Sequence, residues 1–336
     1  MGDVTYFTLA DARYAVGAAA MVGSLRLTGH AGEVVVLDGG MTAEQRAWLA
    51  PHATLVPVPP ELAGRETLIK PFAHTLGRGG VFVWLDADLL VTGALRAAVE
   101  HARAGRVVAA RVEHEAEARR VFAAWEELLG LRAPVRRGQT YLCTGFVAFD
   151  TRRWPELLPR WWETADRIPP GTLFAGEPEA SPFWAQEQDA LNALLMSELP
   201  AGATAPLDEG AMAYRSHLRL VRVEDERTLA CSCDGAPVTM LHLSWRPKPW
   251  RPEARAHAAW DAYHRLVPRV LLAPDAPVSV PRDALVPWLR AGTEGRRACA
   301  AATARRTARA AARTTLRALP QPVQRGVDAA RTRVSA

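Results

Sequence analysis

The sequence has few cysteines and no long apolar run, and both shortages limit what the protein can be. Its 336 residues include four cysteines, too few for the disulfide framework of a small secreted domain. No stretch of about 18 uninterrupted apolar residues occurs, which argues against a membrane-spanning helix. The first residues also lack the basic segment that opens a secretion signal. We therefore expect a cytoplasmic protein without a membrane span.

The cysteines do not form a recognisable zinc motif either. Cys231 and Cys233 are separated by one residue, and no second Cys or His pair stands at zinc-site spacing. With 49% hydrophobic residues, the chain can instead bury one large core or two modest ones. A globular protein stabilised by its core is expected.

Positive charge is concentrated at the C-terminal end. The formal net charge is +5, but residues 290–336 contain eleven Arg against one Glu and one Asp, so this tail carries +9 and the remainder −4. The tail is rich in Ala and Arg, which favour helix, and poor in bulky apolar residues. We expect a basic helical or disordered tail that could bind an anionic inner membrane surface. A solvated tail without a partner explains the charge equally well.

Strand-like and helix-like segments alternate through the first half of the chain. Val4–Ala10, the segment EVVVLDGG and Val81–Leu85 read as buried strands, and helical patterns follow the first two. This alternation predicts an α/β fold with a mostly parallel central sheet and helices on both faces. The expected division is one domain over 1–273, a Pro-rich linker over 274–289 and the basic tail over 290–336.

Two aspartates interrupt the apolar run VFVWLDADLLV. Buried carboxylates need a partner, and Asp86 and Asp88 stand at the end of a predicted central strand, where α/β folds bind ligands. If the extended conformation persists, residues i and i+2 point to the same side and can hold one Mg²⁺ or Mn²⁺. Taken alone, this Asp-x-Asp (DxD) pattern is equally well explained by a turn.

Three other segments strengthen the metal and diphosphate interpretation. His242 would end a later strand, and adding an imidazole to two carboxylates shifts the metal preference from Mg²⁺ towards Mn²⁺. Lys70 and Lys248 are candidate phosphate partners. Glu187, Gln188 and Asp189 crowd the start of a predicted helix, where polar groups can hydrogen-bond a ligand. Structural explanations exist as well: His242 as a core histidine, Lys248 as a surface lysine, and Glu187 to Asp189 as acids favoured near a helix start.

The order of these motifs resembles glycosyltransferase family 8, the group of glycogenin and the bacterial lipooligosaccharide galactosyltransferases. The resemblance spans roughly residues 4–250 and rests on the segments FTLADARYAVGAAAMVGSL, KPFAHTL, VWLDADLLV, CTGFVAFDT, QEQDALN and HLSWRPKPW. It implies a GT-A fold, Rossmann-like in its sheet, and a nucleotide sugar, commonly UDP-linked, used with Mn²⁺ (or Mg²⁺). It also implies that the sugar is transferred with retention of configuration.

The resemblance assigns roles to individual residues. The implied metal ligands are Asp86, Asp88 and His242, and the implied catalytic group is Gln188 with Glu187 and Asp189, a motif completed by Asn192. The implied nucleotide and diphosphate contacts are Leu9, Asp11, Tyr14, Lys70, Asp86, Ala87 and Lys248.

Three positions depart from the family pattern. Cys143-Thr144-Gly145 stands where the family has an amide that contacts the sugar, Glu187 replaces an Asp, and Trp245 replaces a common Gly. These departures leave the identity of the transferred sugar open.

The predicted function is therefore a metal-dependent retaining glycosyltransferase. Its acceptor would be a carbohydrate, a lipid-linked molecule or another small molecule. The acceptor site is expected between Trp154 and Trp184, and the enzyme could be peripheral at the inner membrane face. One alternative is a non-catalytic nucleotide-sugar-binding protein. A sugar nucleotidyltransferase would need a Gly-rich basic loop that the segment TLADARYAVG lacks, and no nucleic-acid partner is expected because no base-reading motif is visible.

Overall fold

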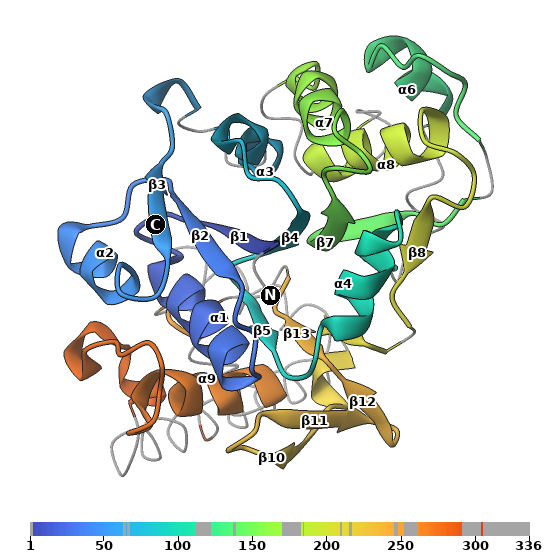
Figure 1. The fold of residues 1–336 in the computed structure, drawn as a ribbon. Helices are drawn as coiled ribbons and strands as arrows, with labels where there is room; N and C mark the ends of the chain where they lie inside the picture. The colour runs from blue at the N-terminus through green and yellow to red at the C-terminus, as the bar shows by residue number, and fades with distance from the viewer. Residues whose placement is uncertain are drawn as a thin grey trace, which may run out of the picture.

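The computed structural model describes most of the chain as one body built around a central sheet (Figure 1). The described residues are 3–62, 65, 68–111, 122–136, 139–169, 183, 185–208, 210–214, 217–244, 248–251, 261–290 and 304.

The central sheet has seven strands in the order β3-β2-β1-β4-β7-β6-β8. Every neighbouring pair is parallel except the two pairs that include β7, so β7 alone runs against the rest. The mostly parallel sheet expected from the sequence is thus confirmed. Its strands are β1 (Val4–Ala10), β2 (Glu33–Asp38), β3 (Thr54–Pro57), β4 (Val81–Leu85), β6 (Val107–Arg111), β7 (Leu142–Asp150) and β8 (Thr204–Pro206).

Helices cover both faces of this sheet (Figure 1). One face packs α3 and α8, with α7 against both, and the other packs α1 and α4, with α9 against α1. The helices are α1 (Ala15–Leu27), α2 (Ala43–Leu49), α3 (Ile69–Phe72), α4 (Arg96–Arg103), α6 (Phe122–Leu128), α7 (Leu157–Asp166), α8 (Glu187–Ser197) and α9 (Ala262–Leu272), with short 3₁₀ turns η1 (Pro60–Leu62), η3 (Ala73–Leu76), η4 (His217–Arg219), η6 (Arg282–Ala284) and η7 (Pro287–Leu289).

Strand β4 lies between two hydrophobic cores, and this position explains why its sequence is apolar. All five of its residues are buried. Because side chains alternate along a strand, Val81, Val83 and Leu85 enter the core beside α1, whereas Phe82 and Trp84 enter the core beside α7 and α8. A strand buried on both faces has no polar positions until it ends. The polar residues that follow it therefore mark the edge of the sheet.

Two small sheets complete the fold. The sheet of β5 (Leu89–Val91), β13 (Met240–His242) and β9 (Met212–Tyr214) places β13 between the other two. The second sheet consists of β10 (Arg222–Asp225), β11 (Ala230–Cys233) and β12 (Ala236–Val238). The first of these matters for function, because it joins the segment after β4 to a distant part of the chain.

The segment predicted as a Pro-rich linker packs on the domain. Val278, Val280, Leu285, Trp288 and Leu289 are all buried in the same core as α1 and α9. The basic tail predicted after it lies outside the described residues, apart from Arg290 and residue 304.

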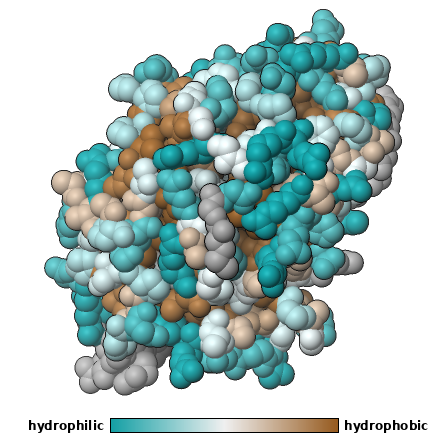
Figure 2. Space-filling model, viewed as in Figure 1, coloured by the Kyte–Doolittle hydropathy of each residue, from teal (hydrophilic) through white to brown (hydrophobic). Residues whose placement is uncertain are grey.

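The visible surface is largely polar. In the orientation of Figure 1, hydrophilic side chains cover most of the face and hydrophobic ones show mainly between them (Figure 2). Within the described part of the chain, Leu128 and Leu220 are the exposed large hydrophobic residues. No helix there combines the length and the apolar character needed to cross a bilayer.

Candidate active site

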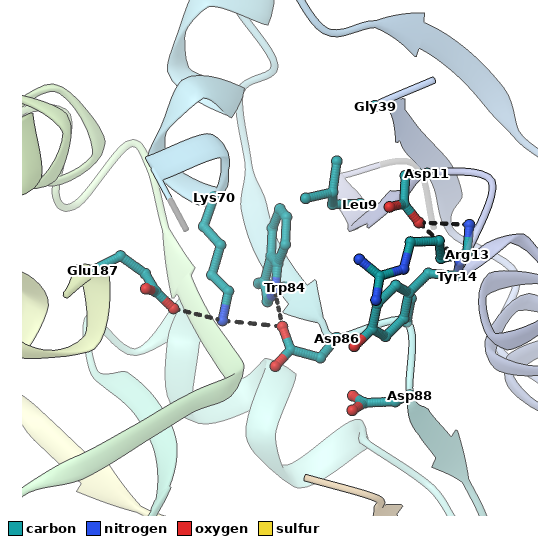
Figure 3. Close-up of a pocket in the computed structure, with 11 residues that line it drawn as sticks. Leu9, Asp11, Arg13, Tyr14, Gly39, Lys70, Trp84, Asp86, Asp88 and Glu187 are labelled. Carbon is teal, nitrogen blue, oxygen red and sulfur yellow. Dashed lines mark hydrogen bonds and ion pairs between the residues drawn. The ribbon is translucent and has the colours of Figure 1, made fainter. Parts of the chain in front are cut away.

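A cavity of about 420 Å³ opens where β1, β2 and β4 end. This volume falls in the range of small-molecule sites, and the carboxyl ends of parallel strands are where α/β folds bind ligands. The side chains around it converge from separate elements (Figure 3). The lining residues are Leu9, Asp11, Arg13, Tyr14, Gly39, Lys70, Trp84, Asp86, Ala87, Asp88 and Glu187.

The two aspartates lie in a turn rather than on an extended strand. Strand β4 ends at Leu85, and the backbone N–H of Leu89 donates to the Asp86 carbonyl at 3.0 Å, which closes a turn before β5. The extended conformation therefore does not persist beyond Leu85, and the turn that the sequence left open is what the structure shows. The turn still directs both to one place, and the indole N–H of Trp84 fixes Asp86 by donating to Oδ1 at 2.7 Å.

His242 reaches this turn because β13 pairs with β5. His242 lies opposite Leu89 in the antiparallel register, and its Nε2 is 3.6 Å from Asp86 Oδ2 and 3.3 Å from Asp88 Oδ1. One ligand atom from each of these three residues lies within 4.8 Å of the others. The sequence-predicted metal ligands thus come together from positions more than 150 residues apart in the chain.

The chemistry of these three groups suits a divalent cation. Carboxylate oxygens suit Mg²⁺ and Mn²⁺, and an imidazole is tolerated better by Mn²⁺. The Nδ1 atom of His242 is buried without a hydrogen-bond partner in the structure. Burial would lower the pKa of His242, but the Asp88 carboxylate and the Cys143 thiol outweigh it and raise the pKa to about 10. Without a cation, the neighbouring carboxylates therefore favour the protonated imidazole, and a metal bound at Nε2 would take the place of that proton.

Both lysines of the chain are buried at this site. Lys70 and Lys248 are the only two in the sequence, and each is less than a tenth exposed. Lys70 Nζ lies 3.0 Å from Asp86 Oδ1 and 3.1 Å from Glu187 Oε1, while Lys248 donates to Asp88 Oδ2 and to the Leu243 carbonyl. Burial opposes the charge on Lys70, but Asp86 and Glu187 raise its pKa above the ordinary value. Burial likewise raises the pKa of Asp88, but Lys248 and His242 hold it well below its usual range.

The start of α8 supplies the third group of polar side chains. Gln186, immediately before the helix, has an unusual positive φ of 37°, which directs the chain into the first turn. The Trp161 indole donates to the Glu187 carbonyl at 2.6 Å, and Asp189 Oδ2 accepts from the Ala185 N–H at 2.6 Å. These contacts fix the position of Glu187, the first helical residue, at the cavity wall.

Tyr14 and its neighbours form the opposite wall. Asp11 Oδ1 accepts from the backbone N–H groups of Arg13 and Tyr14 at 2.8 and 2.9 Å, which orders the turn into α1. The Lys248 ammonium and the Arg251 guanidinium lie 5.9 and 5.2 Å from the centre of the Tyr14 ring, within the range of cation–π contacts. This wall therefore combines an aromatic face with positive charge.

Most residues predicted from the sequence meet at this site, at different depths. Leu9, Asp11, Tyr14, Lys70, Asp86, Ala87, Asp88 and Glu187 line the cavity. His242 and Lys248 contact Asp88 without being lining residues. Gln188, Asp189 and Asn192 are buried and hydrogen-bonded to β7 or to the loop before it.

Sequence reasoning missed three lining residues. Arg13 lies within the predicted turn between Asp11 and Tyr14, and Gly39 directly follows β2, the strand next to β1, so both could have been found from their positions. Trp84 reads as a core residue and gives no such signal.

The expected acceptor region is only partly described. Trp161 and Phe183 are buried, and Trp162 is half-buried against Phe72, with ring centres 6.2 Å apart. Residues 170–182, Trp184 and Trp245 lie outside the described residues.

Comparison with known proteins identifies the fold. No protein-family model matches the chain, and no curated protein does. Solved structures do match: the galactosyltransferase LgtC in complex with donor and acceptor sugar analogues has a TM-score of 0.52 at 17% identity, over 81% of this chain and 98% of that one. An active-site mutant of LgtC gives 0.50 at 17% identity, with the same coverage. The bifunctional glycosyltransferase WbbM gives 0.52 at 15% identity, over 81% of this chain and 50% of that one.

At these identities the likeness establishes the fold. The GT-A architecture expected from the sequence is confirmed, and this chain spans about half the length of WbbM. The narrower assignment to family 8 stays a prediction.

Proposed function

We propose that the protein is a metal-dependent glycosyltransferase that moves a hexose from a nucleotide sugar to a hydroxyl acceptor. The observation that carries the proposal is the cavity itself. Two carboxylates and an imidazole meet at its edge, with a buried lysine on each side, and an aromatic ring lies on the opposite wall. A nucleoside diphosphate needs these three features, namely a cation, additional positive charge and a surface on which its base can stack.

Five residues would bind the cation and the diphosphate. Asp86, Asp88 and His242 would hold a divalent cation, which would act as a Lewis acid and neutralise charge on the diphosphate leaving group. Lys70 and Lys248 add positive charge beside the same phosphates, so that the charge developing on the leaving group is stabilised in a water-poor site.

The nucleoside would lie against the other wall. Tyr14 offers its ring face to the base, with Leu9, Asp11 and Arg13 around it. Ala87, in the aspartate turn, leaves room for the ribose or the diphosphate to pass close to the backbone. Glu187 would order the reacting sugar on the far side of Lys70, while Gln188 and Asp189 hold the start of α8 in place behind it.

The finer assignments come from the resemblance in sequence. On that basis we take UDP as the nucleotide, Mn²⁺ as the metal and retention as the stereochemical outcome. The acceptor would be a carbohydrate, a lipid-linked molecule or another small molecule. The enzyme would work in the cytoplasm, where the basic tail could hold it at an anionic membrane face.

Donor turnover tests the proposal directly. UDP-, GDP- and dTDP-sugars are incubated with the protein in Mn²⁺ or in chelator, and nucleotide release is measured for wild type, Asp88→Ala and the exposed-surface control Glu100→Ala. We expect metal-dependent release of one nucleotide that Asp88→Ala abolishes and Glu100→Ala preserves. If no nucleotide sugar binds or turns over with Mn²⁺, the aspartates are structural and the proposal is wrong.

A non-catalytic nucleotide-sugar-binding protein is the second candidate. It is favoured by Cys143 in place of a sugar-contacting amide and by the ion pairs that Lys70 and Lys248 already make with the carboxylates. The same panel separates the two functions, because a binding protein would take up one nucleotide sugar by calorimetry and release no nucleotide from it.

Membrane binding by the tail is tested in the full chain. Replacing Arg305, Arg306 and Arg309 with Gln should reduce cosedimentation with phosphatidylglycerol-containing vesicles, because each removes a charge that attracts anionic lipid. Replacing three exposed arginines of the domain, Arg96, Arg219 and Arg222, is the matched control. Equal cosedimentation of both variants and wild type would remove the membrane assignment.

A further inference from the structure

Only one of the four polar side chains at the start of α8 faces the cavity. The side-chain amide of Asn192 is hydrogen-bonded to the backbone of Leu142: it accepts from the N–H at 2.7 Å and donates to the carbonyl at 2.8 Å. Asp189 accepts from the Tyr141 hydroxyl at 2.7 Å and from the Ala185 N–H at 2.6 Å. Both side chains therefore hold α8 against the segment that leads into β7.

Both polar atoms of the Gln188 side-chain amide are likewise hydrogen-bonded within the protein. Its Oε1 accepts from the Thr144 N–H at 3.0 Å, and its Nε2 donates to the Tyr141 hydroxyl at 3.1 Å. Turning this amide towards a sugar would leave the buried Thr144 N–H without the acceptor it has here, which costs about 1–3 kcal/mol, and the Tyr141 hydroxyl would keep Asp189 but lose the Gln188 donor. Gln188 is also not a lining residue of the cavity.

Glu187 differs from the other three. Its carboxylate lines the cavity and points towards Lys70 (Figure 3). The Lys70 ammonium contacts Glu187 Oε1 at 3.1 Å and Asp86 Oδ1 at 3.0 Å, so a single lysine links Glu187 to the candidate metal site. The leaving diphosphate would bind at that metal site, and the anomeric carbon is bonded to it. Because only the Lys70 ammonium separates Glu187 from the candidate metal site, the Glu187 carboxylate is placed beside the anomeric carbon.

The surroundings keep this carboxylate in position. The Glu187 carbonyl is fixed by Trp161, and the Thr144 hydroxyl donates to Oε1 at 3.4 Å. Burial raises the pKa of Glu187, against the opposing effect of Lys70, so the carboxylate is more basic than one in water. A desolvated, basic carboxylate with a fixed backbone is suited to attack an electrophilic carbon.

We infer that Glu187, rather than Gln188, is the group that attacks the anomeric carbon of the donor, and that Gln188 is a positioning residue. This inference rests on the proposed function. In the first step a Glu187 oxygen forms a bond to the anomeric carbon while the bond from that carbon to the diphosphate oxygen breaks, and the electron pair leaves with the diphosphate. In the second step the acceptor hydroxyl, or water, attacks the same carbon, its proton passes to a diphosphate oxygen, and the carboxylate is released. Two inversions give net retention.

Azide rescue separates a nucleophile from a structural residue. Glu187→Ala opens space at the position of the attacking oxygen, and azide ion can then attack in its place. The substrate is the donor that wild type turns over in the panel above. We expect Glu187→Ala to lose at least about a thousandfold in nucleotide release, and azide to restore release with formation of a glycosyl azide of inverted configuration.

Three comparisons complete the experiment. Gln188→Ala should lose less of its nucleotide release than Glu187→Ala does, and it should give no glycosyl azide of inverted configuration. Glu100→Ala, a change on the exposed surface, should release nucleotide at the wild-type rate. Thermal unfolding of each variant shows whether it is folded.

Two results overturn the inference while leaving the proposed function intact. In the first, Glu187→Ala is folded and its rate of nucleotide release is within about threefold of wild type. In the second, Glu187→Ala is folded and inactive, and azide yields no glycosyl azide. Wild-type protein that releases no nucleotide from any donor would instead remove the proposed function, and this inference with it.

Discussion

The imidazole of His242 lies against the α-carbon of Gly145. A Cβ added to Gly145 would come 2.3 Å from His242 Cε1 and 2.8 Å from Nδ1, far inside van der Waals contact. The absence of a side chain on β7 is therefore what lets the histidine approach the two aspartates. In this way a single glycine on the central sheet sets the geometry of the candidate metal site.

The first prediction follows from this contact. Gly145→Ala should displace the His242 ring and weaken Mn²⁺ binding at least about tenfold, because the displaced ring no longer supplies a ligand. Binding is measured by the loss of the free Mn²⁺ signal in electron paramagnetic resonance with UDP present. Gly79→Ala is the matched control, because a Cβ there would meet nothing within 4 Å. Equal affinity in both variants would mean that His242 is not a ligand.

The second prediction concerns the two lysines. In folded protein both are buried, and the raised pKa of Lys70 reduces the fraction of its reactive, neutral amine. Brief acetylation at neutral pH should therefore add one group to the folded chain, at the α-amino terminus, and three to the unfolded chain. Intact-protein mass spectrometry counts the groups. Rapid addition of three groups to the folded chain would show that the lysines are accessible, contrary to the structure.

The third prediction concerns the pH dependence of stability. Burial raises the pKa of Glu198, but the hydrogen bond from the Arg160 guanidinium, 2.5 Å from Oε1, the one from the Arg132 backbone N–H and the charges of both arginines together lower the pKa below 4.5. Because the folded-state pKa is below the unfolded value, this contribution is present above about pH 4.5 and is lost as the pH falls through the folded-state pKa. Glu198→Gln should cost about 2 kcal/mol of unfolding free energy at pH 7 and progressively less in acid.

A second glutamate on the same arginine is the control for that measurement. Glu163 also pairs with Arg160, at 2.7 Å, but its side chain is 56% exposed. Glu163→Gln should change the unfolding free energy by less than about 0.5 kcal/mol, because exposed ion pairs contribute little. Urea unfolding from pH 3 to pH 8 compares the two. A pH-independent difference between wild type and Glu198→Gln would contradict the assignment.

The fourth prediction tests the support behind α8. Tyr141→Phe removes the hydroxyl that joins Gln188 Nε2 to Asp189 Oδ1, and both would lose a buried partner. We expect a loss of about 2 kcal/mol in unfolding free energy and a lower kcat for donor turnover, because α8 positions Glu187. The ring itself should still pack against Trp125, 6.4 Å away centre to centre. An unchanged unfolding curve would mean that this network is not stabilising.

The sequence predicted the edge of the sheet well and the details of the site less well. A run that is apolar on both sides and ends in two aspartates is readable, because burial on two faces leaves no polar position inside the strand. The meeting of His242 with those aspartates depends on the pairing of β13 with β5, which no local pattern encodes. That part of the prediction came from the order of motifs along the whole chain.

Two other features differ in how far the sequence announces them. Which residue of the Glu187–Gln188 pair faces the cavity depends on the backbone at Gln186, a positive φ that sequence does not announce. The hairpin between β11 and β12, in contrast, is marked in the sequence by the Asp234-Gly235 pair. Asp234 and Gly235 have φ values of 49° and 81°, as a tight Asp-Gly hairpin turn requires.

The ion pairs of the two lysines affect how the binding of the metal and the binding of the nucleotide depend on each other. Asp86 already has the ammonium of Lys70 beside it, and Asp88 has that of Lys248, so the cavity is close to electrical balance before anything binds. A divalent cation entering by itself would add two charges next to these ammonium groups, and a diphosphate entering by itself would face the carboxylates. Together, the two ligands cancel each other's charge. We therefore expect strong positive coupling between them, in which the apparent affinity for the metal rises with nucleotide concentration and the reverse holds to the same degree.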